Sequence, residues 1–164
     1  MKSKFATSKL DSSENPEKFQ DSIQIKKECL RMLTRRDHSR KEIQGKLTVK
    51  GFDPEQVSTV IDELTRQSWQ DDNRYAESYA RVRSQKGFGP VRIAYELKQQ
   101  GIAPETVDKI IRAMSDNWIA LLKQVYVKKY PEADSIKASA IDSNERGKRI
   151  RFLLQRGFPN AMIS

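Results

Sequence analysis

The chain contains an internal repeat with a spacing of 50 residues, and this feature constrains its fold more than any other. The same pattern occurs twice without a gap, which indicates a duplicated structural unit. The matched pairs are Ile43 and Ile93, Leu47 and Leu97, Gly51 and Gly101, Pro54 and Pro104, Glu55 and Glu105, Val57 and Val107, Val60 and Ile110, and Ile61 and Ile111. A weaker third copy follows at a spacing of 56 residues, where Leu153 corresponds to Leu97 and Gly157 to Gly101.

The apolar residues of each unit are spaced as on one face of a helix. Val57, Val60, Ile61 and Leu64 follow an i, i+3, i+4, i+7 pattern, which predicts an amphipathic helix. A shorter helix before it ends at a glycine, where a left-handed cap is expected, and the next helix opens with proline. Helix-start signals are a capping box at Ser39 and Glu42 and N-caps at Asp53 and Asp71.

Each unit also has a preceding helix, at about 22–36, 72–85 and 116–129. We therefore predict an all-α protein, an elongated tandem array of three three-helix repeats. The predicted boundaries are a flexible leader at 1–21 and repeats at 22–68, 69–115 and 116–164. We expect the last helix to be truncated to a stub at Ala161, Met162 and Ile163.

Composition supports an elongated shape and an acidic partner. The hydrophobic fraction is 37% and the charged fraction is 32%, which argues against one thick core. The net charge of +9 favours nucleic acid, a nucleoprotein assembly, an anionic membrane face or an acidic protein surface, without choosing among them. Because the charge is high and no spare apolar face is evident, we expect a monomer.

Several function classes are disfavoured. His38 is the only histidine, so a His–His metal site is excluded, and there is no phosphate-binding glycine loop. The Asp71-Asp72 pair could serve metal or acid/base chemistry, but a helix cap explains it better. Cys29 lies among apolar residues and is interpreted as a buried hydrophobic side chain. Because it is the only cysteine, no intrachain disulfide can form, and we expect the protein in a reducing cytoplasm. We expect no enzyme, no cofactor, no signal peptide and no membrane-spanning segment.

Basic residues form three groups, one in each predicted repeat. Any single one is best interpreted as part of a solvated helix face, but together they predict a basic stripe that follows a phosphate backbone or a filament. Aromatic residues such as Tyr75, Tyr79 and Trp118 are expected in the core, and Phe88, in the Gly87–Pro90 turn, is the best candidate for exposure. The candidate partner-binding residues are Arg35, Arg36, Arg40, Arg83, Lys86, Phe88, Arg92, Arg149, Arg151 and Arg156.

A family resemblance is carried by a series of short segments. They are Arg36-Asp37-His38-Ser39, Asp71-Asp72-Asn73-Arg74-Tyr75, Lys86-Gly87-Phe88-Gly89-Pro90-Val91-Arg92-Ile93, Glu96-Leu97 followed by Gly101-Ile102, Trp118, Lys129-Tyr130, and Arg151-Phe152-Leu153-Leu154 before Arg156-Gly157-Phe158. In this order they resemble the bacterial RecX regulatory proteins. The resemblance covers about 23–163, and the segment in the second repeat is its most specific part.

The resemblance implies a cytoplasmic modulator of the RecA recombinase. Such a protein would lodge along the groove of the RecA filament on single-stranded DNA and restrain strand exchange, ATP hydrolysis and the co-protease function that triggers the SOS response. Besides RecA, weak direct binding to DNA is a further partner expectation. Two alternatives remain open: a helical protein that binds DNA directly and acts without RecA, and a helical scaffold with neither interaction. Removal of Arg149, Arg151 and Arg156 together is expected to weaken filament inhibition.

Overall fold

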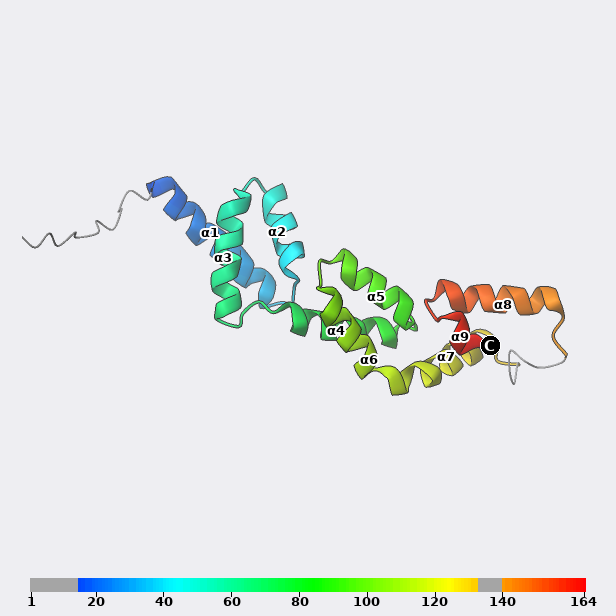
Figure 1. The fold of residues 1–164 in the computed structure, drawn as a ribbon. Coiled ribbons are helices and arrows are strands. Elements are labelled where there is room, and N and C mark those ends of the chain that lie inside the picture. The colour runs from blue at the N-terminus through cyan, green and yellow to red at the C-terminus, as the bar shows by residue number, and fades with distance from the viewer. Residues whose placement is uncertain (1–14, 133–139) are drawn as a thin grey trace, which may run out of the picture.

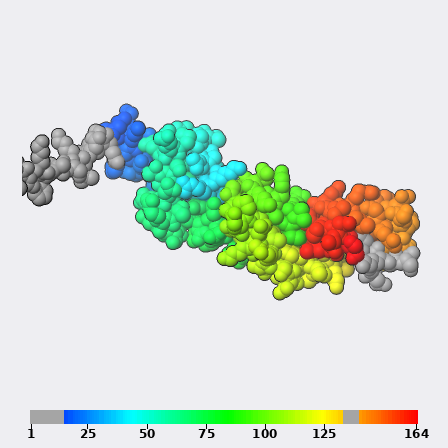
Figure 2. All heavy atoms as spheres, in the orientation of Figure 1, coloured from blue at the N-terminus to red at the C-terminus, as the bar shows by residue number. Residues whose placement is uncertain are grey.

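The structure is a computed structural model that describes residues 15–132 and 140–164. Within these ranges the chain forms nine helices and no strand, which confirms the all-α prediction. The helices follow one another along an elongated molecule (Figures 1 and 2). They are α1 (Pro16–Leu33), α2 (Arg40–Val49), α3 (Pro54–Arg66), α4 (Asp72–Gln85), α5 (Pro90–Gln99), α6 (Pro104–Ala113), α7 (Ser115–Lys129), α8 (Ser143–Gln155) and α9 (Asn160–Ile163).

Helix α1 begins earlier than the sequence predicted. The side chain of Asn15 accepts a hydrogen bond from the backbone N–H of Glu17, and Pro16 occupies the first helical turn. Both residues are standard N-terminal signals, so the predicted start near Ser22 is too late. The sequence interpretation gave more weight to the polar composition of the leader than to this cap. Residues 1–14 of the predicted leader lie outside the described residues.

The predicted helix ends are present. Gly51, Gly101 and Gly157 have φ values of 98°, 78° and 94°, in the left-handed region where glycine is favoured. The side chains of Ser39, Asp53 and Asp71 accept hydrogen bonds from the first turns of α2, α3 and α4, which confirms these caps. The predicted C-terminal stub forms the four-residue helix α9.

The described residues form three small apolar cores: one within α1–α3, one centred on α4–α6 that also includes Trp118 of α7, and one within α7–α9. The first contains Ile25, Cys29, Ile43, Leu47, Val57, Val60, Ile61 and Leu64. Burial raises the pKa of the Cys29 thiol to about 11, so this side chain behaves as the predicted hydrophobe. Trp118 is buried in the second core, as predicted.

The second and third cores are joined, whereas the first stands apart. Leu121 and Met162 each pack against both the second and the third core. Met114 is both the C-cap residue of α6 and the N-cap residue of α7, so a single residue separates the two helices. In the described part of the chain, no helix is long and apolar enough to cross a membrane.

Candidate functional site

The first and second triplets are joined by a network of polar side chains. Asp72 Oδ1, at the start of α4, accepts hydrogen bonds from the backbone N–H of Arg40 at 2.9 Å and from Gln70 Nε2 at 2.9 Å. The same amide of Gln70 donates to the backbone oxygen of His38 at 3.3 Å, and Arg74 pairs with Asp37 at 2.7 Å. Asp72 therefore joins two repeats, a role that the sequence interpretation of the Asp71-Asp72 pair missed.

The second and third triplets are joined by backbone hydrogen bonds. The N–H of Gly89 donates to the oxygen of Arg156 at 2.7 Å, and the N–H of Val91 donates to the oxygen of Gly157 at 3.0 Å. The N-cap residue of α5, Gly89, has no side chain, so the carbonyls of Arg156 and Gly157, just after α8, accept from the amides at the start of α5. A Cβ atom at Gly89 would lie 2.6 Å from the carbonyl carbon of Gly157, so this contact requires glycine.

Phe88 lies at this second junction and is covered by guanidinium groups. The guanidinium carbons of Arg83, Arg92 and Arg156 lie 3.8, 4.6 and 5.0 Å from the centre of its ring. These distances are within the range of cation–π attraction. The expectation that Phe88 is the most exposed of the aromatic residues is wrong. Its ring is partly buried and packs against the second core, whereas Trp69 and Tyr95 are 48% and 63% exposed.

Half of the ten predicted contact residues are held in internal ion pairs. Arg83 and Arg92 both pair with Glu96, at 2.6 and 3.0 Å. The hydrogen bonds of Arg83, Arg92 and Tyr79 lower the pKa of Glu96 against the effect of burial, so its charge is retained at neutral pH. The other pairs are Arg36 with Glu42, Arg40 with Asp62, and Arg149 with Glu145.

The remaining predicted cations have no acidic partner within the described ranges. Arg35, Lys86 and Arg151 make no ion pair there and are exposed. Arg156 also has no carboxylate partner among these residues; it donates to the backbone oxygen of Lys86 and stacks on Phe88 and Phe152. The structure thus separates the predicted basic stripe into two sets. We call Arg36, Arg40, Arg83, Arg92 and Arg149, which make ion pairs, framework residues. We call Arg35, Lys86, Arg151 and Arg156, which make no ion pair within the described ranges, free cations.

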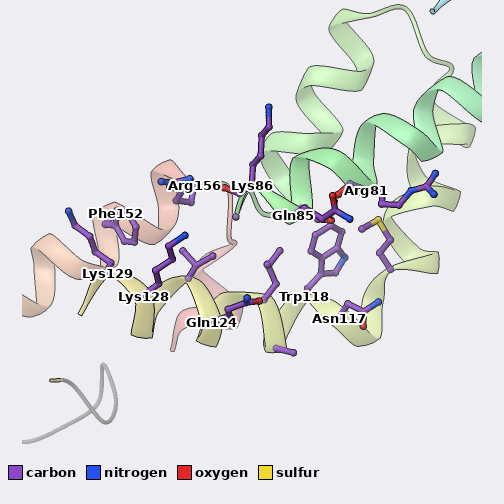
Figure 3. A pocket seen from close by; sticks show the side chains of 16 residues that line it. Arg81, Gln85, Lys86, Asn117, Trp118, Gln124, Lys128, Lys129, Phe152 and Arg156 are labelled. Atoms are coloured by element: carbon purple, nitrogen blue, oxygen red, sulfur yellow. Dashed lines mark hydrogen bonds between the residues drawn. The ribbon is translucent and has the colours of Figure 1, made fainter. Parts of the chain in front are cut away.

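Two of these free cations line a groove between α4, α7 and α8 (Figure 3). The groove has a volume of about 850 Å³. Its basic lining residues are Arg81, Lys86, Lys128, Lys129 and Arg156, and no Asp or Glu lines it among the described residues. Met114, Trp118, Leu121, Val125 and Phe152 supply its apolar lining. We call this site the α4–α7–α8 groove.

The sequence interpretation missed Lys128 and Lys129 and left Arg81 out of the candidates. The two lysines fell at the end of the helix predicted at 116–129, where basic residues are common because they complement the helix dipole. Their spacing from Gln124 and Val125 would have placed Lys128 and Lys129 on the same side of α7 as those residues. Nothing in the sequence indicated that α8 and the end of α4 would face this side.

A second basic groove of about 700 Å³ lies between the end of α1 and α2. It is lined by Arg31, Met32, Arg35, Arg36, His38, Gly45, Lys46, Val49 and Lys50. Here the charges are partly neutralised, because Arg31 and Lys50 pair with Glu28, and Arg36 and Lys46 pair with Glu42. Arg35 is the cation of this groove that makes no ion pair in the described structure.

The described residues hold no cluster of three or more His, Cys, Asp or Glu side chains that could bind a metal ion. Asp71 caps α4 through the N–H groups of Asn73 and Arg74, as the sequence predicted. His38 is buried, its Nδ1 lies 3.0 Å from Glu42 Oε2, and burial lowers its pKa. Asp71 therefore stabilises the start of α4, and His38 is part of the packed interior of the first repeat.

The fold and site define a class of protein: tandem three-helix modules that carry basic grooves on their surface. A family model described as "RecX, first three-helix domain" matches residues 26–64, and one described as "RecX, second three-helix domain" matches residues 71–110. Regulatory protein RecX of Legionella pneumophila strain Corby is 38% identical over 136 residues, covering 83% of this chain and 87% of that protein. Regulatory protein RecX of Pseudomonas fluorescens strain SBW25 is 34% identical over 142 residues, which cover 87% of this chain and 88% of that protein. The chain belongs to the RecX family of regulatory proteins.

Solved structures share the fold. A crystal structure of RecX from Lactobacillus salivarius superposes with a TM-score of 0.70 at 22% identity, over 88% of this chain and 93% of that one. A second crystal structure, of regulatory protein RecX, gives a TM-score of 0.72 at 21% identity, over 89% of this chain and 71% of that one. The tandem helical array is therefore the fold of these structures as well.

Proposed function

We propose that this chain binds the RecA nucleoprotein filament and inhibits its recombinase, ATPase and co-protease activities, thereby modulating DNA repair and the SOS response. The relatives that cover most of the chain are named as regulatory proteins. The observation that carries the proposal is the set of cations without ion pairs along an elongated array within the described residues. Such charges stay available for an acidic, extended partner, whereas paired ones do not.

We infer that the free cations make the contact and that the paired ones hold the framework. Arg35 contributes from the first triplet, Lys86 from the second, and Arg151 and Arg156 from the third. The paired candidates Arg36, Arg40, Arg83, Arg92 and Arg149 then act by fixing the shape of the array, as does Phe88. Action by binding requires no catalytic group.

The proposed units of the array are residues 22–68, 69–115 and 116–164. Each contains one triplet of helices, apart from the first residues of α1 and Ser115 at the start of α7. The first core lies within the first unit, whereas the second core also includes Trp118 of the third unit. We further propose that the protein acts as a monomer in the cytoplasm. The high net charge of +9 disfavours self-association.

ATP hydrolysis by the cognate RecA on single-stranded DNA tests the proposal, with this protein titrated at two salt concentrations. We expect inhibition at less than one protein per recombinase at both salt concentrations. The variant Lys86→Glu/Arg151→Glu should weaken inhibition about tenfold or more while circular dichroism retains the helical signal. Arg149 is left unchanged because its loss would free Glu145 and Tyr126. Inhibition that tracks sequestration of DNA would contradict the proposal.

The second candidate function is direct binding of DNA without RecA. The absence of carboxylates from the described lining of the α4–α7–α8 groove favours it, since phosphate would meet only cations there. The test is binding to single- and double-stranded oligonucleotides across a range of salt. An affinity that falls steeply and log-linearly with salt, together with salt-sensitive ATPase inhibition, would support this candidate.

A further inference from the structure

The rim of the α4–α7–α8 groove concentrates positive charge without internal compensation. Five basic side chains line it, and within the described ranges none of the five has an ion pair and no carboxylate lines the groove. In the second basic groove, by contrast, four of the five Lys and Arg residues pair with Glu28 or Glu42. Close like charges repel one another in the free protein, so an anionic ligand gains energy from relieving this repulsion.

The lining of the groove is apolar as well as basic. Met114, Leu121, Val125 and Phe152 are each partly exposed and come from α6–α7 and α8. Exposed apolar surface in a concave site favours a ligand that covers it with apolar groups of its own. A ligand that carries only negative charge would leave this surface in water.

The aromatic residues of the groove are poorly placed to stack on bases. Trp118 is 2% exposed and donates its indole N–H to the backbone oxygen of Ile111 at 3.1 Å. The ring of Phe152 already contacts Tyr130 edge-on and lies within 5.5 and 5.9 Å of the cationic groups of Arg156 and Lys129. Single-stranded nucleic acid obtains much of its affinity from free aromatic faces, which neither residue provides.

We propose that the α4–α7–α8 groove binds an acidic amphipathic segment of a protein. Apolar side chains of the segment cover Leu121, Val125 and Phe152, and its carboxylates meet the rim cations. The amide side chains of Asn117 and Gln124 lie in the same lining and can hydrogen-bond to the backbone of the segment. The inference rests on the proposed function: the segment belongs to the protein of the filament and not to its DNA.

The chain offers a built-in reporter for this site. It has two tryptophans, Trp69 and Trp118, and Trp118 lines the groove whereas Trp69 does not. The variant Trp69→Phe therefore leaves one tryptophan whose fluorescence responds to an occupied groove. The full chain carrying this change serves as the starting protein for all further variants.

The probe is a synthetic peptide of about fourteen residues with leucine at i, i+3, i+4 and i+7 and glutamate elsewhere. One comparison peptide keeps the glutamates but replaces the leucines by serine, and an oligo-dT of about equal charge is the second comparison. We expect saturable quenching or a spectral shift of Trp118 with the first peptide and at least about tenfold weaker binding of the other two. Equal binding of the oligo-dT, or of the serine peptide, would overturn the proposal.

A matched pair of variants locates the binding. Lys128 and Lys123 are both exposed on α7, but Lys128 lines the groove and Lys123 does not. Lys128→Glu should weaken binding of the leucine–glutamate peptide about tenfold. Lys123→Glu makes the same change in net charge and should change the affinity for this peptide less than about twofold. Equal effects of the two variants would mean attraction by net charge alone and would overturn the proposed site.

Filament inhibition separates this inference from the function on which it rests. Saturating peptide should relieve inhibition of RecA by the wild-type chain, and the serine peptide should not. If the wild-type chain inhibits but the peptide fails to relieve it, the groove proposal is overturned and the proposed function stands. If the wild-type chain does not inhibit at all, the proposed function fails, whatever the fluorescence titration shows.

Discussion

The two junctions between repeats solve the same problem in different ways. The second helix of a triplet has backbone amides in its first turn with no partner inside the helix. At the first junction Ser39 caps α2 and Asp72 accepts from the next amide, that of Arg40. At the second junction the residue equivalent to Ser39 is Gly89, and the carbonyls of Arg156 and Gly157, just after α8, accept from the amides of Gly89 and Val91 directly. Loss of one side chain at this position permits close backbone contact and replaces a polar network by an end-to-end contact of two helices.

The residue before each cap shows the same contrast. At the repeat spacing of 50 residues, His38 in the first repeat corresponds to Phe88 in the second. The ion pair of Glu42 with Lys46 likewise corresponds to the ion pair of Arg92 with Glu96, in which the acidic and basic residues have exchanged places. His38 faces carboxylate oxygen, whereas Phe88 is covered by three guanidinium groups. The first junction is therefore polar, and the second is built on cation–π and backbone contacts.

The largest effect is expected for Gly157→Ala. The residue has a φ of 94°, and an added Cβ would lie 2.6 Å from the backbone nitrogen of Arg92. Left-handed strain and overpacking together should cost about 3 kcal/mol or more in the free energy of unfolding of the third repeat. Urea denaturation followed by circular dichroism would measure this loss.

Gly51→Ala is the matched control for that change. Gly51 has a similar φ of 98°, but a Cβ there would meet nothing within 4 Å. Only the backbone strain of about 1–2 kcal/mol should then appear. Equal losses from the two substitutions would mean that the close approach of α5 and α8 contributes nothing to stability.

A smaller effect is expected from Asp72→Ala at the first junction. Two donors, the N–H of Arg40 and the amide of Gln70, lose their acceptor in a partly buried site. We expect a loss of about 2 kcal/mol in thermal or urea unfolding. Asp72→Asn keeps one oxygen acceptor and should recover at least half of that loss. If the asparagine variant is as unstable as the alanine variant, the hydrogen bonds are not what stabilises this junction.

The first repeat, beside this junction, should also respond to acid through Glu42. Burial by itself raises the pKa of this carboxyl, but Arg36, His38 and Lys46 outweigh it and lower the pKa to about 2 from a usual value of 4.5. Because the folded-state pKa is the lower one, the stabilisation is fully present above about pH 4.5 and is lost as the pH falls toward 2. The free energy of unfolding of the wild type should exceed that of Glu42→Gln by about 2 kcal/mol at pH 6, and the difference should vanish near pH 2. A difference that does not change with pH would contradict this assignment.

The smallest effect is expected from Lys41→Ala. The ammonium of Lys41 donates to the backbone oxygen of Gln99 at 2.8 Å, and its stem covers Gly101, but the contact is exposed. Its loss should change the free energy of unfolding by about 0.5 kcal/mol or less. A cost as large as that of Asp72→Ala would show that the first junction depends on this lysine more than on the buried network.

Much of the fold could be predicted because its signals are local. The apolar spacing of Val57 to Leu64 and the caps at Ser39 and Asp53 act within one helix or one turn, so the sequence displays them directly. The ion pairs of Arg92 with Glu96 and of Arg149 with Glu145 are also local, at a spacing of four residues. These two pairs could have been removed from the candidate site before the structure was known.

The remaining site depends on residues that are distant in sequence. Arg83 meets Glu96, Arg40 meets Asp62, and Arg156 reaches the backbone of Lys86, each across a loop or between repeats. The α4–α7–α8 groove forms because the end of α8 caps α5 and thereby brings Arg156 and Phe152 over α7. A periodic pattern within one helix carries no information about this meeting of helices.

The sequence by itself determined the helices, their ends, the triple repeat and the excess of positive charge, because spacing, capping residues and composition act within one segment of chain. The tertiary structure alone decided which cations are neutralised and which remain free, since that depends on the carboxylates that folding brings within a few ångströms of each guanidinium or ammonium group. It also decided where the free cations gather, because a groove exists only between helices whose angle is fixed by the contacts at their ends.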